Sequence, residues 1–268
     1  MKKLEIVKHH NRLTESIVDY DPIELNVFIG IIHKMHKKND TVVFDMKDIK
    51  QYTNSKNRGY KQFSEVIKKL QEKRIELKMI DGYKSISPFP TLEFNLGEKT
   101  IKVKFHDEII PMLRDLKKHF TLYSIDEFIN LENKHAKRLF QLLKQYQKAG
   151  KRNCTVDYLR AVLNVEYERF YDLEKHVLIK AKDEINKYTT LEIAYKKNKQ
   201  GKTVTSLEFS IRVKKDKMTK KTVKIETRKE VIERALETFE VKLIRDLTEM
   251  QKNILNNTLK SKNFNSVR

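Results

Sequence analysis

The segment that decides the fold of this chain reads Arg169-Phe170-Tyr171-Asp172-Leu173-Glu174-Lys175-His176-Val177-Leu178. Apolar residues recur in it every three or four positions, and after Thr190 they switch to alternation, as in Leu191 to Tyr195. The first period is that of a helix with one buried face, and the second is that of a strand. The same pattern occurs earlier, at 59–70 followed by 74–79. A basic helix that leads into a β-hairpin, present twice, predicts two winged helix-turn-helix domains.

The elements around each basic helix follow one order, which is helix, short strand, helix, turn, basic helix and then strands. In the first copy we expect them at 22–35, 41–44, 46–52, 58–70, 75–80, 90–96 and 100–105. After a strand at 120–124 and a turn of helix capped by Ser124, the second copy follows at 136–146, 153–156, 157–163, 169–186, 191–195 and 204–213. We therefore predict an α+β chain with one winged-helix domain at 1–130 and a second of similar topology at 131–214. Residues 215–268 read as a basic linker and a helical tail, whose near-heptad spacing at 232–254 suits packing on the second domain or on another chain.

The composition favours a polyanionic partner. The formal net charge is +20, and each lysine or arginine placed on a phosphate releases condensed counterions. Nucleic acid is the first expectation and an acidic membrane surface the second, while a solvated lysine-rich surface would give the same composition. The only cysteine is Cys154, so no disulfide framework is expected. The first residues are charged and the run Val27 to Ile32 is too short to span a bilayer, so we expect a cytoplasmic protein without a membrane span.

The sequence lacks the side-chain patterns of nucleotide-dependent or metal-dependent chemistry. His9 and His10 are adjacent rather than alternate, and His33 and His36 share one side of a helix without a carboxylate beside them. A nicking enzyme would need alternating histidines for its metal and a tyrosine nucleophile. The six glycines occur singly, and none lies in a phosphate-binding loop. We expect no catalytic residue, no metal and no cofactor.

The exposed faces of the two basic helices carry the candidate DNA-binding residues, because a helix fits the major groove with its first turns toward the base edges. The second helix offers Arg169, Tyr171, Lys175 and His176. The hairpin after it carries Lys196, Lys197, Lys199 and Lys202, which are placed to hold an adjacent DNA backbone without choosing sequence. The first helix and the turn before it offer Arg58, Lys61, Gln62 and Lys68, of which Gln62 suits adenine and the others phosphate.

A family resemblance lies in Phe120-Thr121-Leu122-Tyr123, in 137–146 with Gly150 after it, in Tyr158-Leu159-Arg160, and in 167–186. The order and spacing of these segments resemble those of the iteron-binding plasmid replication initiators. The resemblance implies two tandem winged-helix domains that bind repeated origin sequences as monomers to start replication and bind an operator as dimers to repress their own gene, which controls copy number. The implied partners are double-stranded DNA, a second copy of the chain, and a host initiator or helicase.

The resemblance also assigns roles to residues. It implies that Arg169, Lys175 and His176 make the main base contacts, and that the first domain divides its surface between DNA and a partner chain. Glu174 stands where such proteins usually have a basic residue, so its carboxylate either accepts from a cytosine amino group or points away. Two other functions remain open, which are a winged-helix transcriptional repressor and a metal-dependent nicking initiator.

Overall fold

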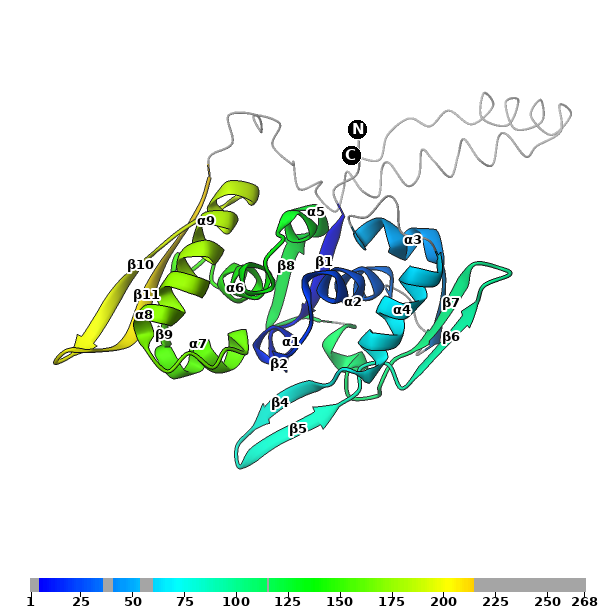
Figure 1. The fold of residues 1–268 in the computed structure, drawn as a ribbon, viewed down its shortest axis with the longest axis horizontal. Coiled ribbons are helices and arrows are strands. Elements are labelled where there is room, and N and C mark those ends of the chain that lie inside the picture. Colours follow the sequence, from blue (N-terminus) through cyan, green and yellow to red (C-terminus); the bar gives the residue numbers. More distant parts are fainter. Residues whose placement is uncertain (1–4, 36–40, 54–59, 115, 215–268) are drawn as a thin grey trace, which may run out of the picture. The chain divides into compact units, whose positions relative to one another are not determined.

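Two sheets of three antiparallel strands, each built with three helical segments, repeat one arrangement along the chain (Figure 1). The computed structural model describes residues 5–35, 41–53, 60–114 and 116–214. The first copy comprises α2 (Pro22–Lys34), β3 (Thr41–Asp45), α3 (Met46–Lys50), α4 (Tyr60–Glu72), β6 (Thr91–Asn95) and β7 (Thr100–Lys104). The second comprises α6 (Lys134–Lys144), β9 (Lys151–Thr155), α7 (Val156–Leu163), α8 (Phe170–Leu173), the helical turn η3 (Glu174–Leu178), α9 (Ile179–Tyr188), β10 (Leu191–Gln200) and β11 (Thr203–Val213).

The strands of the two copies pair in the same order. The first sheet runs β3-β7-β6 and the second β9-β11-β10, so the short strand before the two final helices always pairs with the last strand of its copy. This order confirms the predicted α+β class and the two tandem winged-helix domains. The predicted helix at 232–254 lies outside the described residues.

Local side-chain chemistry explains where several of these helices begin. Asp21 caps α2 by accepting from the backbone N–H groups of Ile23 and Glu24, and the Glu24 carboxylate accepts from Asp21 N–H in return. Asp45 caps α3 as predicted, with its Oδ1 atom 2.9 Å from Lys47 N. Ser124 occupies the predicted N-cap position of α5 (Ile125–Asn130), but its side chain makes no capping hydrogen bond.

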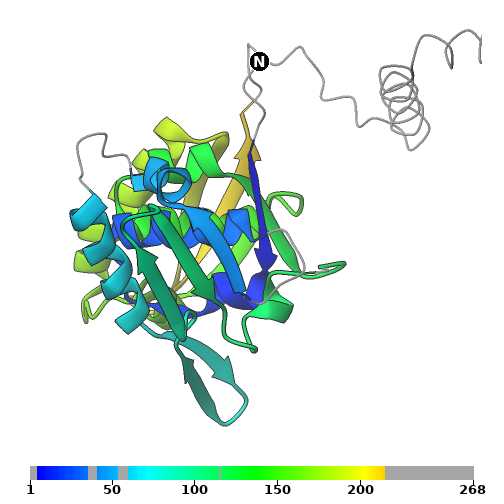
Figure 2. The ribbon, with the colours of Figure 1, turned by 90° about the vertical axis from the view of Figure 1, so that its right-hand side faces the viewer.

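A hairpin between α4 and the wing of the first domain departs from the expected order. β4 (Ile75–Met79) pairs with β5 (Gly82–Ile86) on one side and with β2 (Ile17–Val18) on the other, and the hairpin extends beyond the helices in Figures 1 and 2. The wing of this domain is therefore β6 with β7, and the strand after α4 is not part of it. The sequence did not reveal β5 because only Ile86 in it is buried, which leaves no alternating apolar signal.

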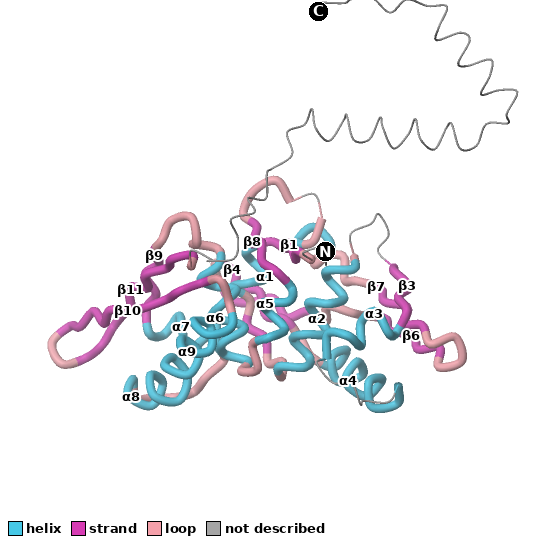
Figure 3. Tube along the Cα trace, turned by 90° about the horizontal axis from the view of Figure 1, so that it is seen from above, coloured by secondary structure: helices cyan, strands magenta, loops and turns pink. Residues whose placement is uncertain are grey.

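The first strand pairs with a strand more than a hundred positions away. β1 (Ile6–His10) is antiparallel to β8 (Phe120–Ser124), with Ile6 opposite Ser124 and His10 opposite Phe120, and the two strands lie side by side in Figure 3. α1 (Asn11–Glu15) follows β1 and contacts α6. The remaining short elements are η1 (Gln51–Thr53) and η2 (Ile110–Met112). Neither β1 nor α1 was predicted from the sequence.

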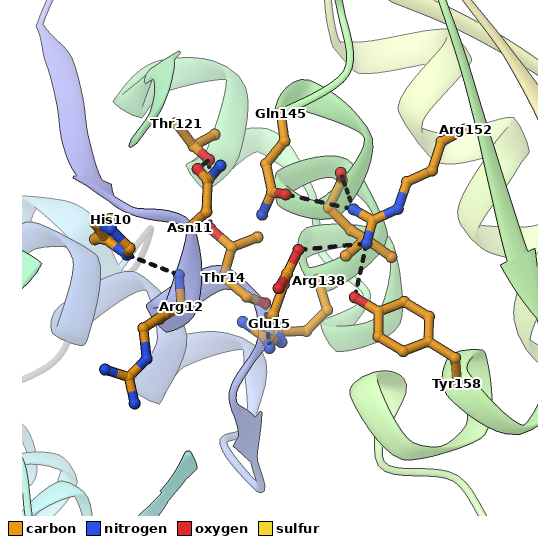
Figure 4. A network of polar contacts seen from close by, with 11 residues as sticks. His10, Asn11, Arg12, Thr14, Glu15, Thr121, Arg138, Gln145, Arg152 and Tyr158 are labelled. Atoms are coloured by element: carbon orange, nitrogen blue, oxygen red, sulfur yellow. Dashed lines mark hydrogen bonds and ion pairs between the residues drawn. The ribbon is translucent and has the colours of Figure 1, made fainter. Parts of the chain in front are cut away.

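Helix α6 carries charged and polar side chains that are buried rather than exposed. Arg138 donates from Nη2 to the carbonyl oxygens of Thr14 and Ser16, at 2.8 and 2.5 Å. From β9, the Arg152 guanidinium reaches Glu15 at 3.4 Å and the Tyr158 hydroxyl at 2.8 Å, as Figure 4 shows. These contacts connect the α1 segment to α6 and β9. They give most of the buried guanidinium donors the partners that burial requires, although Arg138 Nε has none within the described residues.

Candidate nucleic-acid interface

The predicted recognition helix of the second domain is one continuous helix with a widened turn. α8, η3 and α9 follow one another without a break over 170–188, and η3 (Glu174–Leu178) is a π-helical turn. Its inward face is buried, through Leu173, Val177, Leu178, Ala181 and Ile185. Turns of this type are rare and occur often at functional sites. The widened turn, which the sequence did not predict, contains two of the three predicted base-contacting residues.

The structure brings the four candidate residues of this helix together on its exposed face. Arg169 is the N-cap residue of α8, and its side chain is 77% exposed. Tyr171 is 58% exposed, and the Lys175 ammonium lies 5.7 Å from the centroid of its ring. The His176 ring stacks on Tyr167, with centroids 5.8 Å apart and an interplanar angle of 20°. Cationic and aromatic groups therefore lie next to one another on the exposed face of this helix.

Two residues of this site were not among the candidates. Tyr167 supplies the stacking partner of His176 and precedes the helix. Arg160, on α7, donates from Nε to the Tyr167 carbonyl at 2.8 Å and from Nη2 to the Glu168 carbonyl at 2.5 Å. These bonds fix the turn between the two helices of the motif and hence the direction in which the recognition helix starts. The sequence pointed to Arg160 only through the Tyr158-Leu159-Arg160 segment. That segment contributes to the family resemblance but does not indicate what the Arg160 side chain does.

The four lysines predicted in the wing differ in their surroundings. β10 and β11 form a long hairpin with a register shift between Asn198 and Lys199 (Figures 1 and 3). Lys199 and Lys202 lie beyond this shift at the exposed tip, where neither forms an ion pair within the described part of the chain. Lys197 is paired with Glu174, and the Nζ to Oε2 distance is 2.6 Å. Lys196 is exposed on the opposite face of the strand, because successive side chains alternate.

Glu174 is the acidic residue whose role the sequence left open. Its Oε1 atom accepts from the Tyr195 hydroxyl at 3.1 Å while its Oε2 atom meets Lys197. Burial and, after it, the Glu174 carboxylate raise the pKa of Tyr195 above its usual value, so the phenol stays protonated and can donate. The carboxylate thus points toward the wing.

The candidates in the first domain are less fully placed. α4 buries Phe63, Ile67 and Leu70 against α2 and leaves Lys68 exposed. Lys61 and Gln62 lie within α4, but their side chains, like the whole of Arg58, lie outside what the structure describes. The predicted roles of these four residues stay predictions.

The histidines that were weighed as metal ligands have structural contacts. His9 is buried and hydrogen-bonded to the Tyr123 hydroxyl at 2.9 Å, and burial lowers its pKa to about 4. His10 caps α1 by accepting from Arg12 N, and His33 lies 3.3 Å from Glu5. His36 lies outside the described residues. Within the described ranges there is no group of three or more histidine, cysteine, aspartate or glutamate side chains that could hold a metal ion.

The comparisons with known proteins identify two winged-helix regions in the chain. Residues 6–144 match the family described as initiator replication protein, WH1, and residues 155–211 match the family described as initiator Rep protein, WH2. The chain belongs to the initiator replication protein family. This initiator is similar to the "probable replication protein rep" of Bifidobacterium longum (strain NCC 2705), with 26% identity over 168 residues. The aligned region covers 60% of this chain and 57% of the relative, so the match spans little more than half of the relative's length.

The initiator also has the fold of a solved structure. The crystal structure of the Pi initiator protein in complex with iteron DNA is similar with a TM-score of 0.67 and 18% sequence identity, and the match covers 81% of this chain and all of that one. At this identity the likeness is one of fold. None of the helices in the described ranges of the initiator has the length and apolar character that a membrane span requires.

Proposed function

We propose that this initiator starts plasmid replication by binding repeated origin sequences, called iterons, in double-stranded DNA. It acts by binding and not by catalysis. The observation that carries the proposal is the exposed face of the second-domain helix, where Arg169, Tyr171, Lys175 and His176 lie together beside a wing with a basic tip. The chain's membership of the initiator family supports it, as does a fold like that of a protein crystallised with iteron DNA.

The physical mechanism follows from the shapes of the two elements. The recognition helix enters the major groove, where Arg169, Lys175 and His176 reach base edges. The hairpin tip, with Lys199 and Lys202, lies on the neighbouring phosphates and adds affinity without sequence preference. The first domain places α4 on an adjacent part of the same repeat, and Lys68 contributes to phosphate contact.

The remaining parts of the proposal rest on family membership. The chain binds origin repeats as a monomer and represses its own gene as a dimer, and it recruits a host initiator or helicase in the cytoplasm once an array of repeats is occupied. Strand opening then follows from the assembled array and not from a covalent step on DNA.

Footprinting on the DNA that flanks the gene tests the proposal. Protection of several tandem repeats, each about two helical turns long, is the expected result. Protection of one inverted repeat alone would favour a transcriptional repressor. Reproducible nicking of supercoiled origin DNA in the presence of magnesium or manganese would overturn the binding-only mechanism.

Two substitutions test the helix face. Lys175→Ala and His176→Ala should each weaken specific binding by about 1 to 3 kcal/mol, which is the usual value of a lost base contact. Lys148→Ala is the matched control, because Lys148 is exposed on a different surface beside Phe120 and Leu122. If all three variants bind equally well, another face of the helix reads the DNA.

A further inference from the structure

Glu174 is the point at which the recognition helix and the wing of the second domain are joined. Its two carboxylate oxygens have separate partners on β10, the Tyr195 hydroxyl at 3.1 Å and the Lys197 ammonium at 2.6 Å. The Glu174 side chain is 15% exposed, whereas that of Lys197 is 40% exposed. The carboxylate is therefore set back from the surface that its helix presents.

The aromatic groups around this contact bring the same elements together. The Tyr195 ring packs on Phe209 of β11, with centroids 5.6 Å apart. The Lys197 ammonium lies 5.5 Å from the centroid of Phe170, in the first turn of the helix. Tyr195 and Lys197 project from the same face of β10, because they are two positions apart on a strand. The hairpin is thus fixed at its base by one acidic residue and a small aromatic cluster.

The position of the contact along the hairpin separates two kinds of lysine. Lys197 lies before the register shift at Asn198 and Lys199, and it is held against the helix. Lys199 and Lys202 lie after the shift, at the exposed tip. A bulge of this kind bends a hairpin and increases its local twist. The tip can therefore follow a DNA backbone while the base stays attached to the helix.

We propose that Glu174 is a positioning residue that ties the wing to the π turn of the recognition helix, and that it reads no base. This inference rests on the proposed function, since it assumes that the helix and wing bind DNA together. The two contacts hold the Glu174 carboxylate toward β10 and leave its side chain only 15% exposed, so it does not project from the helix toward base edges. The pair also keeps Lys197 out of the phosphate contacts and removes the repulsion between an unpaired carboxylate and DNA.

The salt dependence of binding tests the role of the pair. The double variant Glu174→Gln with Lys197→Gln keeps the local net charge and, under the proposal, removes no phosphate contact. The slope of the logarithm of its binding constant against the logarithm of salt concentration should therefore equal that of the unaltered chain. Lys199→Gln, the matched control, should reduce the magnitude of the slope by about 0.9, because it removes one phosphate contact. A comparable reduction in the double variant would show that Lys197 contacts phosphate and would overturn the proposal.

Site selection from randomised DNA tests base reading. Glu174→Gln should leave the preferred base at every position unchanged. The contact of Glu174 with Tyr195 and Lys197, which we call the clamp, holds the wing and touches no base. Loss of a cytosine preference at one position, with the other positions intact, would identify Glu174 as a base reader and overturn the proposal. Glu192→Gln is the control for the change in net charge. Glu192 is exposed on β10, the strand that carries Tyr195 and Lys197.

Amide hydrogen exchange without DNA separates a failure of the clamp from a failure of the proposed function. Exchange at 195–200 should become roughly tenfold faster in Glu174→Gln, because a charge-assisted contact is lost, and it should be unchanged in Glu192→Gln. Faster exchange in a chain that binds no repeated DNA would sustain the clamp and refute the function. Equal exchange in all three proteins would refute the clamp, whatever DNA is bound.

Discussion

Replacing the buried Lys137 by methionine should stabilise the chain at neutral and acidic pH and lose this effect in alkali. Lys137 is fully buried on α6, where its ammonium donates to the Phe128 carbonyl at 2.6 Å and lies 4.7 Å from the Phe128 ring centroid. Burial lowers the pKa of Lys137 from 10.5 to about 7, and the carboxylates of Glu184 and Glu132 offset part of that effect. The folded state therefore binds this proton less tightly than the unfolded state does.

The sign and size of the effect follow from the two pKa values. Below pH 7 both states carry the charge and the full penalty applies, and the penalty disappears as pH rises toward 10.5. At about 1.4 kcal/mol for each tenfold change in proton affinity, the penalty is roughly 5 kcal/mol. About 4 kcal/mol of it should be lost between pH 6 and pH 10. The variant also removes a hydrogen bond worth about 1 to 3 kcal/mol, so the net gain at pH 6 is smaller than the penalty.

Urea denaturation followed by circular dichroism measures this difference. The free energy of unfolding of Lys137→Met minus that of the unaltered chain should fall by about 4 kcal/mol from pH 6 to pH 10. Lys148→Met is the control, because Lys148 is exposed, and its difference should stay constant. A difference for Lys137→Met that does not change with pH would refute the reasoning, because it would mean that the buried amine titrates normally.

Three further outcomes are expected. Burial lowers the pKa of His9 to about 4, so its contribution to stability rises as pH increases from about 4 to 6.5, and His9→Gln should remove up to about 3 kcal/mol of that pH dependence in urea titrations. Arg152→Lys should cost about 2 to 4 kcal/mol in the same assay, since an ammonium cannot replace the guanidinium that donates to the Tyr158 hydroxyl and to a buried carbonyl. Gly30→Ala should lower the free energy of unfolding by about 1 to 3 kcal/mol although alanine favours helices, because its Cβ would overlap the ring of Tyr52; Tyr52→Leu should recover part of the loss.

The sequence predicted the elements whose signals are local. Asp21 with Pro22, and Asp45 before α3, are caps that can be recognised within a few residues. The 170–188 helix and β10 were predicted because a period of 3.6 changes to one of 2 at Thr190. β5 was missed because its residues are exposed apart from Ile86. β1 was missed because its buried positions are Val7 and the polar His9, which give no apolar alternation.

The candidate site divides in the same way. The exposed face of the recognition helix could be derived from the apolar stripe, since Tyr171, Lys175 and His176 lie opposite it. The sequence could not show which lysines of the wing form ion pairs within the chain, because Lys197 and Glu174 come together only in the folded chain. Lys137 illustrates the same limit in the core. A lysine on a helix is expected to be exposed, but α6 is covered by elements from both ends of the described chain.

The two winged-helix domains differ in how each joins its helix to its wing, and this difference bears on how they divide the work. In the first domain the β4–β5 hairpin separates α4 from the β6–β7 wing and pairs with β2. In the second domain the helix leads directly into the β10–β11 wing, and Glu174 ties the two together. A DNA-binding domain whose helix and wing are already held in one geometry loses less conformational entropy when it binds DNA. We therefore expect the second domain to be the one that recognises sequence, while the first has a protruding hairpin that its own wing does not use.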